Sequence, residues 1–176
     1  MQSAKEQIID QLLVMDAQDG DAGAMEKLVG RWQKRLWRHA YRLVGDTEAA
    51  WDVTQQTWLG IIRGLRRLRD PTDFRAWAYR ITTNKSIDWI KKSCAAKQVS
   101  IEEIQDPPQE QKKDIGLKEL LQKLDIRKRA VLSLYYFEQL SVPEIGAALN
   151  IPGGTVKSRL HSARNKLKEL YERQYE

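Results

Sequence analysis

This chain of 176 residues is poor in cysteine, histidine and long apolar runs. Cys94 is the only cysteine, and the two histidines, His39 and His161, lie far apart in the sequence. An intrachain disulfide is therefore excluded, and no Cys/His cluster has the spacing of metal ligands. No apolar run approaches the ~20 residues that cross a membrane, and the N-terminus lacks a basic-then-apolar secretion signal. We expect a cytoplasmic protein without metal, cofactor or membrane insertion.

Signatures of catalysis are missing as well. No glycine-rich loop is followed by Lys and then Ser or Thr, as a phosphate-binding loop would be, and the pair Gly153-Gly154 suits a turn better. His39 falls on a helix that is expected to be mostly buried, where a packed, hydrogen-bonded histidine is more common than a ligand. We expect no enzyme activity from this chain.

Charged residues are plentiful but unevenly distributed. Residues 22–95 carry 15 Lys and Arg against 7 Asp and Glu, and residues 117–173 carry 11 against 6, within a net charge of +6. The segment between these two blocks is acidic. Two basic blocks suggest two modules that bind a polyanion, although basic side chains that only keep helix surfaces hydrated would give the same count.

Strand patterns of useful length are absent, and nearly every apolar repeat has the helical period. We predict an all-α fold with two helical domains joined by a flexible linker, the second domain ending in a helix-turn-helix. The predicted boundaries are an N-terminal helix with its cap at 1–21, a first domain at 22–95, the linker at 96–114 and a second domain at 115–173. The linker is predicted because that segment is rich in glutamine and has few large apolar side chains.

One helix of the first domain is predicted to run from about residue 47 to 68. Its apolar residues follow the helical period, so we expect them to share one buried face. The residues expected on that inner face are Trp51, Trp58, Ile61, Ile62, Leu65 and Leu68.

The most informative segment lies near the C-terminus. Ser141 suits a helix N-cap, and Pro143 is tolerated in the first turn. Residues 150–154 are expected to interrupt the helix, because Pro152 lacks a donor and the glycines cost backbone entropy. Beyond the break, a second helix has one apolar stripe and a face rich in hydrogen-bond donors, which suits insertion into a DNA major groove. The donors expected on that face are Thr155, Lys157, Ser158, Arg159, His161, Ser162 and Arg164.

Four segments, in this order and spacing, resemble the extracytoplasmic-function sigma factors of bacterial RNA polymerase. They span residues 36–46, 52–58, 74–84 and 154–164. The first three are similar to that family's first conserved-region, core-binding and promoter-melting patterns, and the fourth to the end of its helix-turn-helix. The resemblance implies a transcription initiation factor whose first domain, sigma region 2, binds core polymerase and opens the −10 element. Its second domain, sigma region 4, would bind the −35 element.

For the −35 element, the implied contacts are made by the helix-turn-helix from Ser141 to His161 and by Arg164. Arg159 and Lys157 suit guanine O6 and N7 or phosphates, and Thr155 at the helix N-terminus suits a phosphate. Ser158, His161 and Ser162 suit bases or sugars. Which of these residues touch bases rather than phosphates stays open at this point.

For the −10 element, Asn84 matches a family position near the pocket for an extruded base of the non-template strand. An amide suits such a pocket because it offers a donor and an acceptor together. The basic residues near it on the same predicted helix would meet phosphates of the single strand. These are Arg80, Lys85, Lys91 and Lys92.

The resemblance also implies contacts with core polymerase, namely with the clamp helices of the largest subunit and with the flap of the second largest. The clamp-binding face would consist of Asp52, Gln55, Gln56, Leu59 and Arg63. Gln56 stands where the family usually has a glutamate, which removes one charge from this face. The resemblance also makes an anti-sigma factor a possible partner, since such partners are common in the family, although no residue of this chain requires one.

Two other classes of protein remain as alternatives. A response-regulator transcription factor has a similar helix-turn-helix but would bring an α/β receiver domain, and the first 95 residues look entirely helical. A helical adaptor that binds only protein is the second alternative. Salt dependence separates it from a DNA-binding protein, since a DNA-binding protein loses affinity steeply as counterions are released at rising salt.

Overall fold

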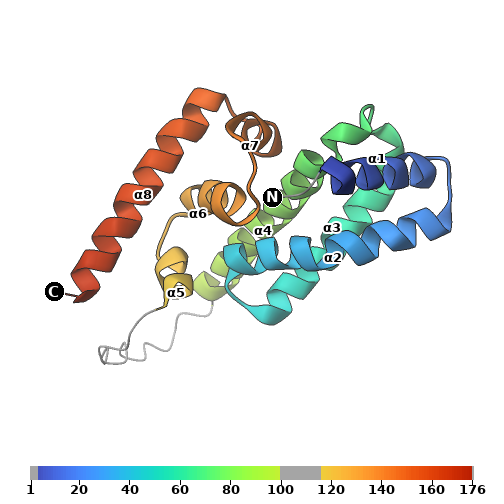
Figure 1. The fold of residues 1–176 in the computed structure, drawn as a ribbon. Helices are drawn as coiled ribbons and strands as arrows, with labels where there is room; N and C mark the ends of the chain where they lie inside the picture. Colours follow the sequence, from blue (N-terminus) through green and yellow to red (C-terminus); the bar gives the residue numbers. More distant parts are fainter. Residues whose placement is uncertain (1–3, 100–115, 176) are drawn as a thin grey trace.

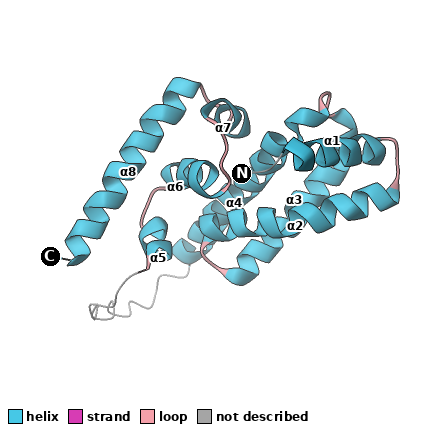
Figure 2. Cartoon of the chain, in the orientation of Figure 1, coloured by secondary structure: helices cyan, strands magenta, loops and turns pink. Residues whose placement is uncertain are grey.

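A computed structural model describes residues 4–99 and 116–175, with side chains at 4–95 and 116–173. Throughout these residues the secondary structure is helical, with short turns between helices and no strand (Figure 2). The predicted all-α fold is confirmed. Within residues 4–99 and 116–175, no helix combines the length and the hydrophobicity of a membrane-spanning segment.

The N-terminal half contains four helices in one bundle (Figure 1). They are α1 (Ala4–Gln18), α2 (Ala22–Val44), α3 (Thr47–Gly64) and α4 (Phe74–Val99), with two 3₁₀ turns, η1 (Leu65–Arg67) and η2 (Pro71–Asp73). The Asp21 carboxylate caps α2 by accepting from the backbone of Gly23, and Asp46 caps α3 by accepting from Ala49. Each carboxylate satisfies orphan donors at the positive end of its helix.

The core of this half is built around Trp32 of α2. Its ring lies edge-on to Phe74 and to Tyr79 of α4, with centroids 5.2 and 5.9 Å away. Leu28 and Leu36 extend the same buried stripe by one turn in each direction. Aromatic pairs in this edge-to-face geometry gain about 0.5–1.5 kcal/mol beyond the area that they bury. The packing therefore fixes α4 firmly against α2.

The C-terminal half contains α5 (Leu117–Gln122), α6 (Ile126–Leu132), α7 (Val142–Leu149) and α8 (Gly153–Tyr175). Between α6 and α7 the helix widens into a π-helical turn, η3 (Ser133–Phe137). Such turns are rare and are often found at functional sites. Figure 1 shows α8 along the outer side of this half, with α5, α6 and α7 between it and the N-terminal bundle.

Two details differ from the sequence prediction. Trp51 and Ile62 of α3 are 43% and 54% exposed, although both were expected on its buried face. The Trp51 ring packs against the Trp37 ring at the surface of the bundle, with their centroids 5.5 Å apart, and the Ile62 side chain points to solvent. In the helix-turn-helix, the break ends at Pro152, and both glycines belong to the first turn of α8. Glycine costs little in a first turn, where the backbone is only partly hydrogen-bonded.

The two halves pack directly against each other, which was not predicted. Helix α7 lies against α4, while α5, α6 and η3 contact α2. The predicted linker at 96–114 falls mostly outside the described residues, and its first four residues continue α4 as helix. The predicted domain boundaries remain a prediction.

Candidate promoter and polymerase interfaces

The first helix of the helix-turn-helix, α7, begins at the N-cap that the sequence predicts, Ser141. Ser141 and Glu144 form a reciprocal capping box, in which each side chain accepts from the other residue's backbone N–H. The box satisfies two orphan donors at the start of α7. The helix ends at Asn150, whose φ of 53° is left-handed, a conformation that asparagine tolerates better than most residues.

Gly146 makes the tight turn possible. The Ile151 N–H donates to the Gly146 carbonyl at 3.0 Å, so the chain returns directly over this residue. A Cβ on Gly146 would lie 2.9 Å from the Ile151 carbonyl oxygen, closer than side-chain carbon packs against backbone. Glycine at this position therefore sets how closely the turn approaches α7, and with it the direction in which α8 leaves the turn.

Helix α8 separates its apolar and polar residues as predicted. Val156, Leu160 and Ala163 are buried against the rest of the half. The predicted DNA-facing residues Lys157, Ser158, His161, Ser162 and Arg164 are exposed, and Thr155 and Arg159 are half-buried. The structure thus brings the seven residues onto the accessible surface of one helix, with Thr155 in its first turn.

Arg164 differs from the other six. Its Nε donates to the Tyr136 hydroxyl at 2.7 Å, and its guanidinium lies 5.6 Å from the ring centroids of Tyr135 and Tyr136. This residue is therefore held against η3. Lys157 is exposed near the start of α8, and the exposed Ser158 donates its hydroxyl to the Thr155 carbonyl of the same helix at 3.0 Å.

The predicted −10 residues lie on one helix, α4. Arg80, Asn84, Lys91 and Lys92 are exposed, and Lys85 is half-buried. The opposite side of α4 carries buried hydroxyls: Thr82 and Ser86 donate to the carbonyls four residues earlier, at 2.9 Å each. These internal hydrogen bonds allow α4 to be buried among α2, α3 and α7 while it still presents a polar strip to solvent.

The predicted clamp-binding residues form an exposed face of α3. All five are exposed: Asp52, Gln55, Gln56, Leu59 and Arg63. The outward-facing Ile62 lies beside them, so this face is partly apolar, which the sequence prediction missed. A small hollow of about 140 Å³ joins this face to the −10 strip, lined by Asp52 and Gln56 of α3 and by Lys85, Asp88 and Lys92 of α4.

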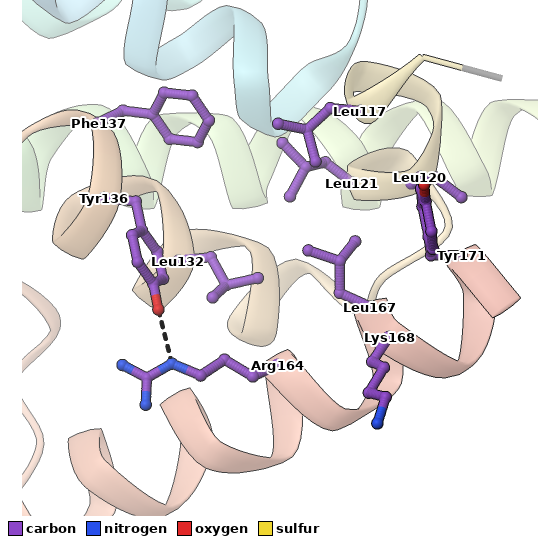
Figure 3. Close-up of a pocket in the computed structure, with 10 residues that line it drawn as sticks. All are labelled: Leu117, Leu120, Leu121, Leu132, Tyr136, Phe137, Arg164, Leu167, Lys168 and Tyr171. Carbon is purple, nitrogen blue, oxygen red and sulfur yellow. Dashed lines mark hydrogen bonds between the residues drawn. The ribbon is translucent and has the colours of Figure 1, made fainter. Parts of the chain in front are cut away.

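A larger apolar hollow of about 480 Å³ lies in the C-terminal half between α5, α6, η3 and α8 (Figure 3). Leu117, Leu121, Leu132 and Leu167 line its floor, and Figure 3 shows Tyr136, Phe137 and Tyr171 around them. Arg164 and Lys168 add positive charge at its edge on α8. The sequence prediction missed this hollow because its residues come from four short segments.

Contacts between the halves form a polar group that we call the interdomain clasp. Its members are His39, Arg42, Arg75, Tyr79, Arg129, Ser133, Glu138 and Glu144. Glu138 is its centre: the carboxylate lies 2.5 Å from Arg42 Nη1 and also accepts from the Tyr79 hydroxyl. Arg75 donates to the Glu138 carbonyl and pairs with Glu144 at 3.2 Å. Burial and the neighbouring Glu138 carboxylate raise the pKa of Tyr79 well above its usual value.

His39 lies in the same clasp and is fully buried. Its Nδ1 is 2.9 Å from the Ser133 hydroxyl of η3, and its Nε2 is 2.9 Å from the Thr83 hydroxyl of α4. Burial, together with the nearby positive charge of Arg42, lowers the pKa of His39 from 6.5 to about 3. The imidazole is therefore neutral, as expected for a packed, hydrogen-bonded histidine.

Comparison with known proteins shows which family this arrangement belongs to. Residues 28–94 match the family description Sigma-70 region 2, and residues 120–169 match Sigma-70, region 4. The chain belongs to the sigma-70 family of sigma factors. It is 30% identical over 159 residues to the ECF RNA polymerase sigma factor SigL of Mycobacterium tuberculosis, covering 85% of this chain and 90% of that protein, which places it among the extracytoplasmic-function sigma factors. It is 34% identical over 170 residues to the ECF RNA polymerase sigma factor SigE of Mycolicibacterium smegmatis. That match covers 89% of this chain and 65% of the length of SigE. It is 28% identical over 174 residues to SigW of Bacillus subtilis, covering 89% and 93%.

Solved structures have the same fold. CnrH, in complex with the cytosolic domain of CnrY, superposes with a TM-score of 0.73 at 28% identity, covering 93% of this chain and 97% of that one. RpoE of Bartonella quintana, in complex with the anti-sigma factor NepR, has a TM-score of 0.69 at 22% identity, covering 84% and 96%. The resemblance found in the sequence is confirmed, and this sigma factor acts in transcription initiation. The two matched regions confirm its two domains.

Proposed function

We propose that this sigma factor divides promoter recognition between α4 and α8. Helix α8 enters the major groove of the −35 element with Thr155, Lys157, Ser158, Arg159, His161, Ser162 and Arg164 available for contact. The observation that carries the proposal is the exposed polar face behind a tight turn, supported by the match to sigma region 4. Lys157 and Arg159 supply charge for phosphates or guanine edges.

In the first domain, α4 receives the −10 element as a single strand. Asn84 reads an extruded base, and Arg80, Lys85, Lys91 and Lys92 hold the phosphates near it. Support comes from the shared exposed strip on α4 and from the match to sigma region 2. The turn before α4 is positioned by Asp70, which accepts from the Thr72 N–H at 2.8 Å. This hydrogen bonding lowers the pKa of Asp70 below its usual value, and the turn at 69–73 would form one wall of the pocket for the extruded base.

Core RNA polymerase is the proposed protein partner of both domains. The face of α3 formed by Asp52, Gln55, Gln56, Leu59 and Arg63 would contact the clamp helices of the largest subunit, with Ile62 adding apolar area. The apolar hollow of the second domain would receive an amphipathic segment of the flap of the second largest subunit. Its leucine floor and basic edge favour a helix with apolar anchors and acidic flanks.

An anti-sigma factor is a further proposed partner. CnrH, at 28% identity, was solved with the cytosolic domain of a second protein, CnrY, so a relative of this fold binds a protein partner. We also propose that the chain has no catalytic activity, since RNA synthesis belongs to the polymerase, and that it acts in the cytoplasm.

Binding both promoter elements requires the two domains to separate. The names −35 and −10 denote positions about 25 base pairs apart, or about 85 Å at 3.4 Å per base pair. In the closed arrangement, α7 contacts both α4 and α8. A helix layer is about 10 Å thick, so the two DNA-binding helices are held much closer than the promoter requires. The closed arrangement described here is therefore a state that precedes promoter binding.

Transcription in vitro with purified bacterial core polymerase tests the proposal. A library of promoter fragments would be transcribed with and without the factor, and the start sites sequenced. We expect factor-dependent start sites that share two upstream elements. If the same start sites are used with and without the factor, the proposal is contradicted.

A further inference from the structure

We propose that the interdomain clasp is a pH-sensitive latch, with His39 as the group whose protonation opens the two domains. The inference concerns regulation before promoter binding and rests on the contacts between the domains. It does not depend on which residues touch DNA.

The latch is polar and joins distant parts of the chain. Arg42 and Glu138 are separated by 96 residues, Tyr79 and Glu138 by 59, and His39 and Ser133 by 94. Buried polar contacts of this kind depend on every partner staying in place, because a buried polar group left without a partner loses its solvation without compensation. The closed arrangement therefore depends on the protonation state of the groups within it.

The C-terminal domain also completes the end of α2. The last carbonyls of a helix have no partner within it. Gln122 donates to the Arg42 carbonyl at 2.8 Å, and Arg129 donates to the Leu43 carbonyl, so the second domain supplies two of the missing donors. Gly45 permits this approach: its φ is +81°, and a Cβ there would lie 2.8 Å from the Gln122 side chain. These contacts hold the second domain against α2 in the neighbourhood of His39.

His39 is the member of the latch whose ordinary pKa, 6.5, lies closest to neutral pH. Both ring nitrogens are occupied, one by a hydroxyl of each domain, and no water-accessible surface remains. The charged and titratable groups around it are Arg42 on α2, Tyr79 on α4 and, near Tyr79, the side chains of Arg35, Arg75 and Glu138. From α6, Arg129 reaches the Leu43 carbonyl one turn along α2. Protonation of His39 in the closed state would bury a second positive charge beside Arg42, which destabilises that state.

The sign of the effect follows from the burial of His39. In the closed state its pKa is lowered to about 3, whereas separation of the domains removes Ser133 and admits water, which returns the pKa toward 6.5. The open state therefore binds the proton more tightly, and the closed state loses stability as pH falls below about 6.5. With an ordinary histidine pKa in the open state, the ratio of open to closed molecules rises about tenfold between about pH 7.5 and about pH 5.5.

An intramolecular distance measurement on the full chain tests this latch. Cys94, the sole cysteine, is exposed on α4, and a second cysteine can be introduced on α8 as Glu172→Cys, which is also exposed. Single-molecule energy transfer between dyes at these two positions reports the open fraction without DNA or polymerase. We expect the ratio of open to closed molecules to rise about tenfold as pH is lowered from about 7.5 to about 5.5.

Substitutions separate His39 from the other groups of the clasp. His39→Gln keeps a neutral donor and acceptor at every pH, so the open fraction should lose most of its dependence on pH. His161→Gln is the matched control, because His161 is the only other histidine and is exposed on α8. It should respond like the wild type. Glu138→Gln weakens the pairing with Arg42 and should raise the open fraction at neutral pH.

The outcomes are distinguishable even if one variant folds poorly. A wild-type open fraction that does not change over this pH range would overturn the proposal without any variant. An unchanged pH response in folded His39→Gln, checked by circular dichroism, would overturn the role of His39. Loss of the response in His39→Gln but not in His161→Gln would support it. Failure of the promoter assignments in transcription assays would leave these outcomes unaffected.

Discussion

The two helices proposed to bind DNA, α4 and α8, are held in different ways. Helix α4 is packed by α2, α3 and α7 and satisfies its buried hydroxyls internally, which leaves a narrow polar strip around Asn84. Helix α8 packs on one side only and presents a broad donor-rich face. A narrow strip on a rigid support suits a single base taken out of a strand. A broad face suits a groove that is contacted at many points.

This comparison predicts that single substitutions on α8 reduce duplex affinity, while those on α4 affect strand opening. The largest effect is expected at Arg159. Arg159→Ala should weaken binding to a −35 duplex by about 1–3 kcal/mol, because a bidentate contact to guanine is worth that much. A filter-binding assay with holoenzyme measures this. Affinity equal to that of the wild type would reject the contact and reduce the contrast between the helices.

The turn that directs α8 should be sensitive to size. Gly146→Ala places a Cβ 2.9 Å from the Ile151 carbonyl oxygen, and such overpacking costs about 1–3 kcal/mol of folding free energy. Gly154→Ala is the matched control, since a Cβ there meets nothing within 4 Å. Thermal unfolding followed by circular dichroism compares the two variants. If both variants lose the same folding free energy, the close approach at Gly146 does not contribute to stability.

On α4, the predicted effect is on opening and not on duplex binding. Asn84→Ala should leave −35 binding intact and weaken the open complex by about 0.5–1.5 kcal/mol, the usual contribution of one neutral hydrogen bond. Permanganate reactivity of unpaired thymines in the −10 region measures the bubble. A bubble as large as that of the wild type would remove Asn84 from the proposed pocket.

The smallest effect is expected for a phosphate contact on α8. Lys157→Ala should lower affinity by a similar factor for all sequences and reduce the salt dependence by about one released counterion. Binding measured over a series of potassium chloride concentrations gives this slope. An altered preference among −35 sequences, with the slope unchanged, would move Lys157 from the phosphate to a base edge.

Local features of this fold could be predicted from the sequence. The cap at Ser141 and the buried stripe of α8 depend on neighbours within a few residues, so composition and period were sufficient. The packing of the two domains could not be predicted. Its contacts use Arg42, Tyr79 and Glu138, and helical periodicity gives no reason to pair charged or polar residues 59 or 96 positions apart.

The wrong predictions have a related cause. Trp51 and Ile62 are apolar and fall at helical spacing, but period alone does not say how far a neighbouring helix extends over that face. Both side chains lie on parts of α3 that no neighbouring helix covers fully. The exposure of the site residues on α4 and α8 could be predicted, because the apolar positions of each helix are buried in the core and the polar positions between them remain at the surface. Their roles toward DNA remain predictions.

The π-helical turn at 133–137 makes the length of this segment as important as its composition. One stretch of five residues directs Ser133 to the first domain and Tyr136 and Phe137 to the apolar hollow. Loss of one residue here would rotate everything beyond it by about 100°, the angle of one helical residue, and carry Glu138 away from Arg42. Substitutions could be tolerated across this turn in related chains, whereas insertions and deletions would be selected against. Comparing the frequencies of the two kinds of change would reveal that constraint.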